Sequence, residues 1–332
     1  MEPPAQLAWM IKMEKLVHTP NNHPEWNESF YFCFSDRENS IDAMTRLGFK
    51  PNKDEAMTFF LIFLPDGSVA GYRDTETIHG EWGNHEWRAK GMRFISQNDG
   101  SWRYIYEGPL IHVANPEDFP SIQRKPALIR AILPTRMEIN FNPIHIEYEY
   151  SEHMTQESLE IGKKAGEKHW EQIGIIHGTI NLGDKTYNIQ SQIGQRDHTY
   201  GVRDWTGVGD WLYYVVWFNE KLAVNPAAIV MDDGRVSWGG FLYKDGVNHP
   251  IVEMKILDQK FKDRVIPISS KLKLITQEGE TYILKGKAGP AVPLPFMNDE
   301  GAISVLAQSF GEFTLDNNIK GYGSFETLRV KL

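Results

Sequence analysis

Short apolar runs separated by glycine-containing turns make up most of the chain. Residues 57–76 (MTFFLIFLPDGSVAGYRDTE) give an apolar run, a Pro-Asp-Gly turn and a second strand-like run. Further units of this form lie within residues 92–108, 228–257 and 271–286, and they turn at Asn-Asp-Gly, Asp-Asp-Gly, Lys-Asp-Gly and Glu-Gly-Glu. Asp-Gly and Asn-Gly between strands favour hairpins because the turn needs a positive φ. Hairpins at such short spacing predict an all-β protein built of antiparallel sheets, meanders or barrels.

One segment near the midpoint departs from this pattern. Residues 154–174 (MTQESLEIGKKAGEKHWEQIG) are rich in Glu, Lys and Ala, and Thr155 is a suitable helix N-cap. We interpret the segment as a helix or linker that joins two β-domains. A chain of 332 residues is too long for one ordinary core, so we expect an N-terminal domain over residues 1–170 and a C-terminal domain over residues 171–332.

Composition and charge narrow the possible partners. Aromatic residues make up 12% of the chain, and rings both favour strands and line apolar ligand cavities. The net charge of −9 argues against nucleic acid and anionic membranes as partners. The single cysteine, Cys33, excludes an internal disulfide framework and a Cys-rich metal site. Neither an apolar run of membrane-spanning length nor a signal-peptide pattern is found, so we expect a cytoplasmic protein, as a monomer or homodimer.

The densest cluster of charged and aromatic residues is GQRDHTYGVRDW, over residues 194–205. Neighbouring residues of a strand point to opposite faces. If this stretch is extended, Arg196, His198 and Tyr200 share one face and Asp197 lies on the other. Adjacent arginine and aspartate residues are therefore not expected to pair with each other.

Two interpretations of this cluster stay open. In the structural one, Arg196 and Arg203 pair with nearby carboxylates in a buried network, since a buried charge is costly without a partner. In the functional one, an acid lies beside an aromatic cavity, and it could protonate or deprotonate an apolar substrate. Asp197, His198 and Asp204 are the candidates for that catalytic role.

Other stretches carry weaker candidates. Residues 23–34 (HPEWNESFYFCF) place Trp26 and Glu28 ahead of a strand. Residues 79–91 (HGEWGNHEWRAKG) contain His79, Glu81, His85 and Glu86, but glycine and asparagine interrupt the run and no HExxH spacing occurs. We therefore expect no metal site. Phosphate-binding glycine motifs and the G-x-S-x-G elbow of serine hydrolases are missing from the sequence, and we expect no cofactor.

The motif at the centre of the chain resembles a known family. Residues 169–205, with their Gly-x-Arg-Asp-His run, are similar to the central signature of the hydroxyneurosporene synthase (carotenoid 1,2-hydratase)-like family, although Thr199 and Tyr200 replace the usual Ser and Trp. Residues 26–36 (WNESFYFCFSD) and 321–327 (GYGSFET) resemble its opening and closing strands. The resemblance implies two lipocalin-like antiparallel β-barrels packed together, with an apolar cavity at or between them. Activities in the family include adding water across isoprenoid double bonds and guiding cycloadditions.

Two functions remain open from the sequence. The first is a cofactor-free hydratase, dehydratase or cyclase that acts on a terpenoid or another apolar molecule. Asp197 or Asp204 is the acid, and His198 either orients that acid or activates water. Glu28 and Glu326 are alternative positions for the acid. The residues expected to line the substrate cavity are Tyr200, Trp205, Trp211, Tyr213, Trp26 and Glu28.

The second function is a carrier that binds a lipid, isoprenoid or pigment without chemistry, because a barrel interior can hold one apolar ligand. The position of the carboxylates distinguishes the two functions. A carrier would keep Asp197 and Asp204 in salt bridges away from its ligand, whereas an enzyme would expose one of them to the cavity.

Overall fold

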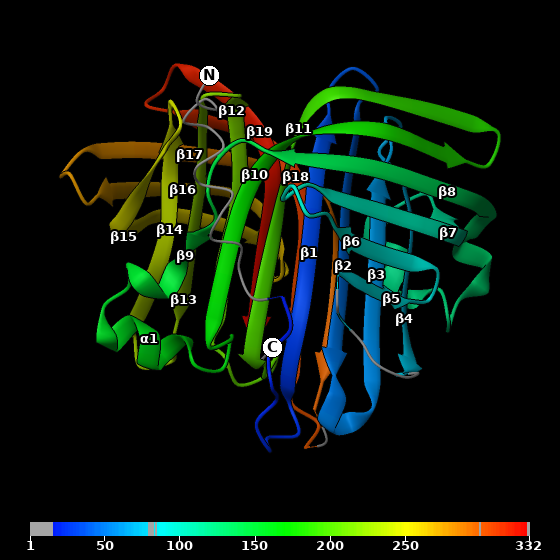
Figure 1. The fold of residues 1–332 in the computed structure, drawn as a ribbon, viewed down its shortest axis with the longest axis horizontal. Coiled ribbons are helices and arrows are strands. Elements are labelled where there is room, and N and C mark those ends of the chain that lie inside the picture. The colour runs from blue at the N-terminus through cyan, green and yellow to red at the C-terminus, as the bar shows by residue number, and fades with distance from the viewer. Residues whose placement is uncertain (1–15, 79–82, 84, 299, 331–332) are drawn as a thin grey trace.

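Two antiparallel β-sheets lie side by side and form nearly the whole protein (Figure 1). The computed structural model describes residues 16–78, 83, 85–298 and 300–330. The strands of the first sheet are β1 (Trp26–Asp36), β2 (Ile41–Lys50), β3 (Glu55–Phe63), β4 (Val69–Thr77), β5 (Glu86–Ala89), β6 (Met92–Ser96), β7 (Trp102–Val113), β8 (Ile129–Pro143), β9 (Tyr148–Glu149), β10 (Lys168–Leu182) and β11 (Lys185–Val202). Those of the second are β12 (Asp210–Asn219), β13 (Leu222–Val230), β14 (Val236–Lys244), β15 (Val247–Lys262), β16 (Ile266–Thr276), β17 (Thr281–Met297), β18 (Ile303–Leu315) and β19 (Ile319–Val330).

Both sheets curl into barrels. The second is a closed barrel in which β12 to β19 pair in sequence order and β19 returns to β12. The first sheet has the order β4-β3-β2-β1-β11-β10-β8-β7-β6-β5, and a short pairing of β4 with β7 links its two sides. The all-β class and the two packed antiparallel barrels expected from the sequence are confirmed.

The hairpins predicted from turn chemistry are present. They are β3–β4, β6–β7, β13–β14, β14–β15 and β16–β17. The glycine of each turn has a positive φ, as at Gly67 (80°) and Gly234 (85°). A side chain at such a position would strain the backbone, and this need explains why the turns could be located from sequence.

The helix at the midpoint is shorter than predicted. It spans Gln156–Gly162 as α1, and the Thr155 side chain caps it by accepting a hydrogen bond from the backbone N–H of Ser158 at 3.1 Å. Short 3-10 helices complete the described elements: η2 (Pro51–Lys53), η3 (Pro116–Ser121), η4 (Pro126–Leu128) and η5 (Tyr150–Glu152). Among the described residues, no helix has the length and apolar character needed to cross a bilayer.

The domain boundary expected between residues 170 and 171 is wrong, because it does not agree with the order of the strands in the sheets. That point lies inside β10, which pairs with β8 and β11, while β11 pairs with β1. The chain therefore passes from the first sheet to the second between Val202 and Asp210. The helix precedes the last two strands of the first barrel instead of joining the barrels.

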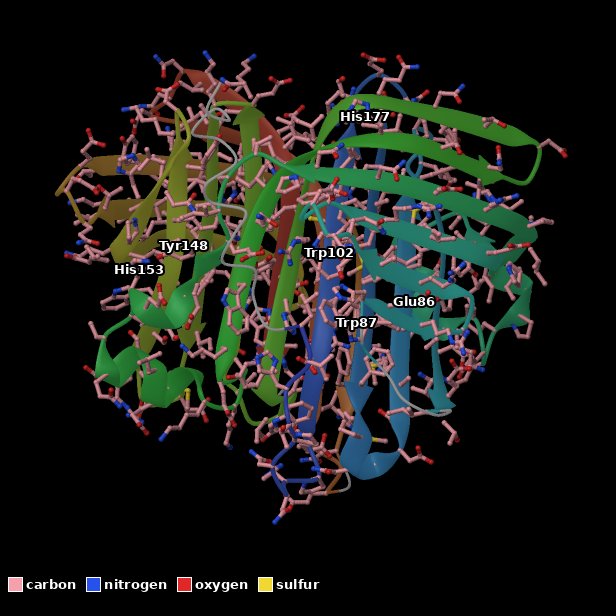
Figure 2. All side chains as sticks on the ribbon, viewed as in Figure 1. Glu86, Trp87, Trp102, Tyr148, His153 and His177 are labelled. Carbon is pink, nitrogen blue, oxygen red and sulfur yellow. The ribbon has the colours of Figure 1, made fainter. Side chains whose placement is uncertain are left out.

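Aromatic side chains fill the interior of the first barrel. Phe30, Phe32 and Phe34 of β1 point inward, and Trp87 and Trp102 lie beside this strand in Figure 2. The ring centroids of Phe30 and Trp87 are 4.4 Å apart. The second barrel has its own apolar core, and a third cluster lies between the two barrels and contains residues of both. Every residue of β1 is buried, because one face of the strand lies in the first barrel and the other faces the second.

Candidate functional site

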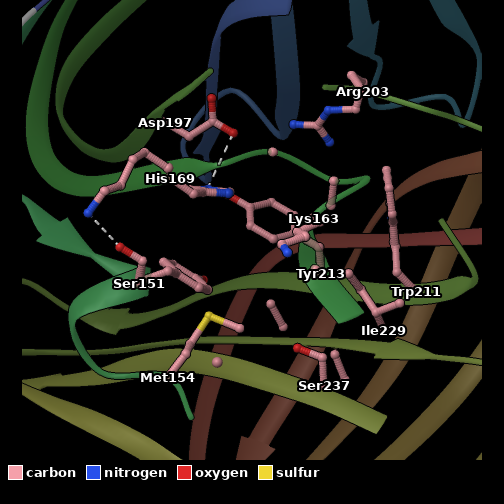
Figure 3. A pocket seen from close by; sticks show the side chains of 18 of the residues that line it. Ser151, Met154, Lys163, His169, Asp197, Arg203, Trp211, Tyr213, Ile229 and Ser237 are labelled. Carbon is pink, nitrogen blue, oxygen red and sulfur yellow. Dashed lines mark hydrogen bonds and ion pairs between the residues drawn. The ribbon is translucent and has the colours of Figure 1, made fainter. Parts of the chain in front are cut away.

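A cavity of about 600 Å³ lies between the two barrels (Figure 3). Its walls come from β1–β3, β10 and β11 of the first barrel, from β12–β14, β18 and β19 of the second, and from the segment around α1. The cavity is therefore at the interface and not inside a barrel. Its polar lining includes Tyr31, Arg46, His169, Asp197, Arg203, Tyr213 and Glu326.

Strand register builds the wall on the first barrel. Residues directly opposite each other in antiparallel strands have side chains on the same face of the sheet. Tyr31 is paired with Asp197 on one side and with Arg46 on the other, and Asp197 is also paired with Glu171. The pairs continue through Arg46 to Phe59 of β3. These residues thus form one row across five strands, on the outer face that meets the second barrel.

A second row lies on the facing wall. Tyr213 of β12 is paired with Glu326 of β19 and with Ala227 of β13. Glu326 is in turn paired with Gln308 of β18. The two rows bring carboxyl groups from different barrels, Asp197 and Glu326, to the lining of one cavity.

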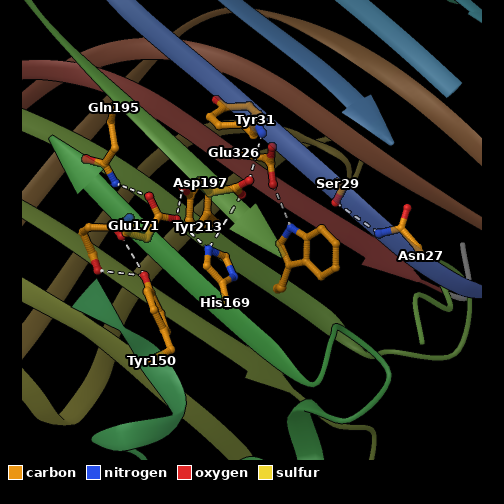
Figure 4. A network of polar contacts seen from close by, with 12 residues as sticks. Asn27, Ser29, Tyr31, Tyr150, His169, Glu171, Gln195, Asp197, Tyr213 and Glu326 are labelled. Atoms are coloured by element: carbon orange, nitrogen blue, oxygen red, sulfur yellow. Dashed lines mark hydrogen bonds and ion pairs between the residues drawn. The ribbon is translucent and has the colours of Figure 1, made fainter. Parts of the chain in front are cut away.

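Hydrogen bonds connect the two walls (Figure 4). The carboxyl group of Glu171 accepts hydrogen bonds from Tyr213 Oη at 2.5 Å and from Gln195 Nε2 at 2.6 Å. Nε2 of His169 lies 2.6 Å from Glu171 Oε1 and 3.7 Å from Asp197 Oδ2. The backbone N–H of Tyr31 donates to Asp197 Oδ1 at 2.9 Å. Asp197 is therefore fixed in position while it faces the cavity.

Burial gives Glu326, Asp197 and His169 different protonation states at neutral pH. Burial, together with the nearby charge of Asp197, raises the pKa of Glu326 to about 8, and among the described residues only Trp211 Nε1 donates to that carboxyl, at 3.2 Å. Burial raises the pKa of Asp197 only to about 6, because His169 and the arginines oppose the shift. Burial also lowers the pKa of His169 to about 4. At neutral pH, Glu326 is a protonated acid, Asp197 is mostly ionised and His169 is neutral.

The free energy of unfolding, measured as a function of pH, is expected to show that Glu326 is protonated in the folded protein. Its carboxyl holds a proton in the folded state up to about pH 8 but loses it near pH 4.5 when exposed, so folding binds a proton between these values. Raising the pH through that window lowers stability, with a slope near 1.4 kcal/mol per pH unit for one proton. Urea unfolding of Glu326→Gln should show a slope shallower by about that amount. Glu253→Gln, at a half-exposed surface site, is the control, and equal slopes in wild type and Glu326→Gln would contradict the assignment.

Two groups of side chains have the donor atoms that a metal ion would need. In each group, the possible ligand atoms lie within 4.8 Å of one another. One group is His18, Glu28 and His198, and the other is His169, Glu171 and Asp197. In both groups the carboxylate is already hydrogen-bonded to histidine, at 2.6 Å for His18 Nδ1 and Glu28 Oε1. Hydrogen bonding accounts for both arrangements, and the expectation of no metal stays a prediction.

Some of the residues predicted from the sequence meet at this cavity. Asp197, Trp205, Trp211 and Tyr213 line it, as the functional interpretation of the central motif requires. The ring centroids of Trp205 and Trp211 are 5.5 Å apart. Asp197 therefore stays the candidate for acid–base chemistry.

Other predicted residues lie away from the cavity lining. His198 points into the first barrel, where its ring stacks on Phe30 at 4.3 Å and its Nε2 lies 3.0 Å from Glu28 Oε1. Burial acts to raise the pKa of Glu28, but hydrogen bonds with His18 and His198 outweigh it and hold the pKa below its ordinary value. Tyr200 stacks on His18 at 3.7 Å, and Trp26 lies beside Tyr200. We assign this cluster to the packing of the first barrel, because alternation along β1 and β11 turns it away from Asp197.

Asp204 has a local structural role. Its Oδ1 accepts hydrogen bonds from the backbone N–H groups of Thr206 at 3.1 Å and Gly207 at 2.9 Å. Lys164 lies 3.5 Å from its other oxygen. Asp204 thus holds the connection between the barrels, and we do not place it in the chemistry.

The two arginines of the motif differ. Arg196 donates to Glu147 Oε1 at 2.8 Å and to Gln172 Oε1 at 2.9 Å, inside the first barrel. Arg203 was also expected to pair with a carboxylate, and this is wrong. Among the described residues, no carboxylate oxygen lies within 4.0 Å of its guanidinium, which instead lies over the ring of Trp205 at 5.3 Å.

Residues 79–91 were considered as a metal-binding motif, and their described side chains make other contacts. His85 Nδ1 lies 2.9 Å from Ser96 Oγ, and Glu86, labelled in Figure 2, accepts a hydrogen bond from Arg93 Nε at 2.8 Å. His79 and Glu81 lie outside the described residues.

Sequence reasoning missed several residues of the site. Arg46 and Tyr31 come from β2 and β1, and His169 and Glu171 come from β10. One signal was available for Glu171: in an antiparallel hairpin of β10 and β11, it is opposite Asp197 and shares its face. No local pattern marked Arg46, because its place depends on pairing with strands distant in the chain.

Solved structures share this architecture at low sequence identity. A Nitrosomonas europaea protein assigned as AttH is 12% identical, with a TM-score of 0.62 over 91% of this chain and 92% of that chain. CghA is 11% identical, with a TM-score of 0.59 over 93% and 89%. Kievitone hydratase from Nectria haematococca is 8% identical, with a TM-score of 0.54 over 91% and 88%. At such identities the likeness shows the fold alone.

The sequence itself matches one described family. No curated protein matches the chain. The resemblance to hydroxyneurosporene synthases agrees with the fold, while membership of that family stays a prediction. Residues 13–331 match the family described as "Domain of unknown function (DUF7064)", and this span is nearly the whole sequence. The chain therefore belongs to the DUF7064 family.

Proposed function

We propose that the protein is a hydratase, dehydratase or cyclase that acts by acid–base chemistry on an apolar small molecule bound between its barrels. The observation that carries the proposal is a pair of carboxyl groups on one cavity with separated pKa values, about 8 for Glu326 and about 6 for Asp197. Two titratable groups whose environments differ in this way are suited to the roles of acid and base.

In a dehydration, Glu326 is the general acid and Asp197 the general base. Glu326 donates its proton to the substrate hydroxyl, and the C–O bond breaks to release water. Asp197 removes a proton from the adjacent carbon, and the electrons of that C–H bond form the double bond. Hydration is the same sequence in reverse. Trp205, Trp211 and Tyr213 provide ring faces that stabilise positive charge on carbon by cation–π attraction.

Apolar lining supports the class of substrate. Met44, Phe59, Leu159, Ala227, Ile229 and Leu306 lie around the polar groups. A cavity of about 600 Å³ lies within the range of pockets that bind drug-sized ligands. Terpenoids and similar apolar molecules fit this lining. The names of two neighbours in fold, kievitone hydratase and CghA, the latter also solved with Sch210972, agree with small-molecule chemistry on this architecture.

A carrier without chemistry is the alternative, and the position of the carboxyls disfavours it. Asp197 faces the cavity, where its Oδ2 lies 3.7 Å from His169, and Glu326 lines the same cavity. Charges facing an apolar ligand cost free energy that a carrier has no reason to bear.

The test is a search for turnover in small-molecule extracts of the source cells. Wild-type protein is incubated with the extract, and mass spectrometry compares it with the Asp197→Asn/Glu326→Gln double variant. We expect wild type alone to convert a compound into one that differs by the mass of one water, or into an isomer of the same mass. A compound that binds both proteins equally and leaves unchanged would indicate the carrier instead.

A further inference from the structure

Arg46 and Arg203 place two positive charges at one end of the cavity without carboxylate partners in contact. Arg46 is only 7% exposed, and among the described residues no carboxylate oxygen lies within 4.0 Å of either guanidinium. Both guanidiniums lie over the ring of Trp205, at 5.4 Å for Arg46 and 5.3 Å for Arg203. By contrast, Arg196, which is 2% exposed, has Glu147 at 2.8 Å. The fold thus pairs Arg196 with a carboxylate, whereas Arg46 and Arg203 keep their charge available for a ligand.

The hydrogen-bonding capacity of both side chains is also incompletely used. Arg203 Nε is buried and has no hydrogen-bond partner. Arg46 Nη2 donates to Asn27 Oδ1 at 3.1 Å, and within the described part of the chain the other nitrogens of this guanidinium have no side-chain acceptor. Buried donors without acceptors cost free energy unless a ligand provides the acceptor.

The backbone makes room for this arrangement. Gly48 lies two residues beyond Arg46 on β2, so both face the cavity side of the sheet. A Cβ atom at Gly48 would lie 2.5 Å from Arg46 Nη1. Glycine at this position therefore lets the guanidinium lie flat over the strand beside the cavity.

The carboxyl groups close to Arg46 and Arg203 leave a net positive charge at that end of the cavity. Asp197 is the carboxylate there that is ionised at neutral pH, and it uses Oδ1 for the Tyr31 N–H. The other lining carboxylates, Glu160 and Glu167, come from the segment around α1. Glu326 is protonated at neutral pH, since burial and the nearby charge of Asp197 raise its pKa to about 8. The lysines at the mouth are already paired, Lys163 with Glu160 and Lys168 with Glu149. At the arginine end of the cavity, two arginines beside one ionised carboxylate leave a positive charge that a ligand anion would neutralise.

We propose that the substrate is an amphiphilic acid, whose carboxylate binds between Arg46 and Arg203 while its apolar body extends toward the wall formed by Met154 and Ser237. Figure 3 shows Arg203 and Asp197 on the side of the pocket away from these two residues, with Tyr213 between. This inference rests on the proposed function because it names the substrate of the same cavity. It places the reacting carbons between the anchored head and the far wall, beside the acid and the base.

Binding of a matched pair of probes tests the proposal without turnover. The fluorescent polyene cis-parinaric acid and its methyl ester have the same apolar body, and only the acid carries charge. Wild type should bind the acid at least about 10-fold more tightly than the ester, as expected for charge-assisted hydrogen bonds. Arg46→Met and Arg203→Met should each lose most of this preference while binding the ester as before.

Two further variants separate the charge from the fold. Gly48→Ala keeps both arginines but displaces the Arg46 guanidinium, and it should weaken acid binding alone. Arg73→Met is the matched control, because Arg73 lies over Phe296 at 4.2 Å and outside the cavity lining. Equal binding of acid and ester by wild type, absence of binding by both, or an unchanged preference in Arg46→Met and Arg203→Met would each overturn the proposal. Since no reaction is measured, these results are independent of whether the protein is a lyase.

Discussion

Glu326→Gln is expected to lower turnover at least about 100-fold while leaving the fold intact, the usual scale for loss of a general acid. Glutamine preserves the shape of the side chain and can still accept the hydrogen bond from Trp211 Nε1, but it has no proton to donate. Asp197→Asn should have an effect of similar size, because Asn keeps an acceptor for the Tyr31 N–H but is not a base. Steady-state rates on the substrate found by the extract screen, with circular dichroism, measure both effects.

Asp42→Asn is the matched control for these variants. Burial raises the pKa of Asp42 to about 6, as it does for Asp197, yet Asp42 hydrogen-bonds to Ser35 and Tyr322 and is outside the cavity lining. We expect this variant to keep its turnover. Full activity in both Glu326→Gln and Asp197→Asn would remove the two carboxyls from the mechanism and favour the carrier.

Arg196→Met is expected to lower the free energy of unfolding by about 3 kcal/mol. The change removes the cation that donates to Glu147 and Gln172. Breaking a buried pair costs roughly 3–5 kcal/mol, and the lower end applies because Glu147 keeps 19% exposure to water. The contact of the guanidinium with the ring of Trp102, at 4.8 Å, is lost as well. Urea unfolding measures the difference.

Arg203→Met provides the comparison for that result. In the described part of the chain, Arg203 has no carboxylate oxygen within 4.0 Å, and methionine removes a partly buried charge while keeping an apolar stem beside Trp205. We therefore expect its stability to be equal to that of wild type or higher. If Arg196→Met unfolds at the same urea concentration as wild type, the ion pair contributes nothing measurable and the structural role of Arg196 is wrong.

Local features of the fold were predictable from the sequence, and features set by distant pairing were not. A turn such as that at Gly67 depends on a few neighbouring residues, so its hairpin could be read directly. The boundary near residue 170 failed because β10 and β11 complete the first barrel by pairing with β8 and β1, strands distant in the chain. Helical composition over 154–174 gave way to strand from Lys168 onward for the same reason.

In the candidate site, too, local features were predictable from the sequence and features set by distant pairing were not. Alternation along one strand separated Asp197 from His198 and left one of them on the cavity. It could not tell which face was the cavity, and so Asp197 as the acid and His198 as its partner were both kept as catalytic candidates. Glu326 was considered only as an alternative, since its position opposite the first barrel depends on the packing of the two barrels. Arg46 had no local signal at all.

Strand β1 has consequences for how new substrate preferences could arise in this family. All of its residues are buried, but alternate positions serve different purposes. Phe30, Phe32 and Phe34 pack in the interior of the first barrel, while Ser29 and Tyr31 line the cavity. Variation at the odd-numbered positions can therefore retune specificity without loosening the barrel interior. A single inserted residue would exchange the two sets of side chains along the strand. The lining that β1 contributes to the cavity can therefore change by substitution, but not by insertion of a residue into the strand.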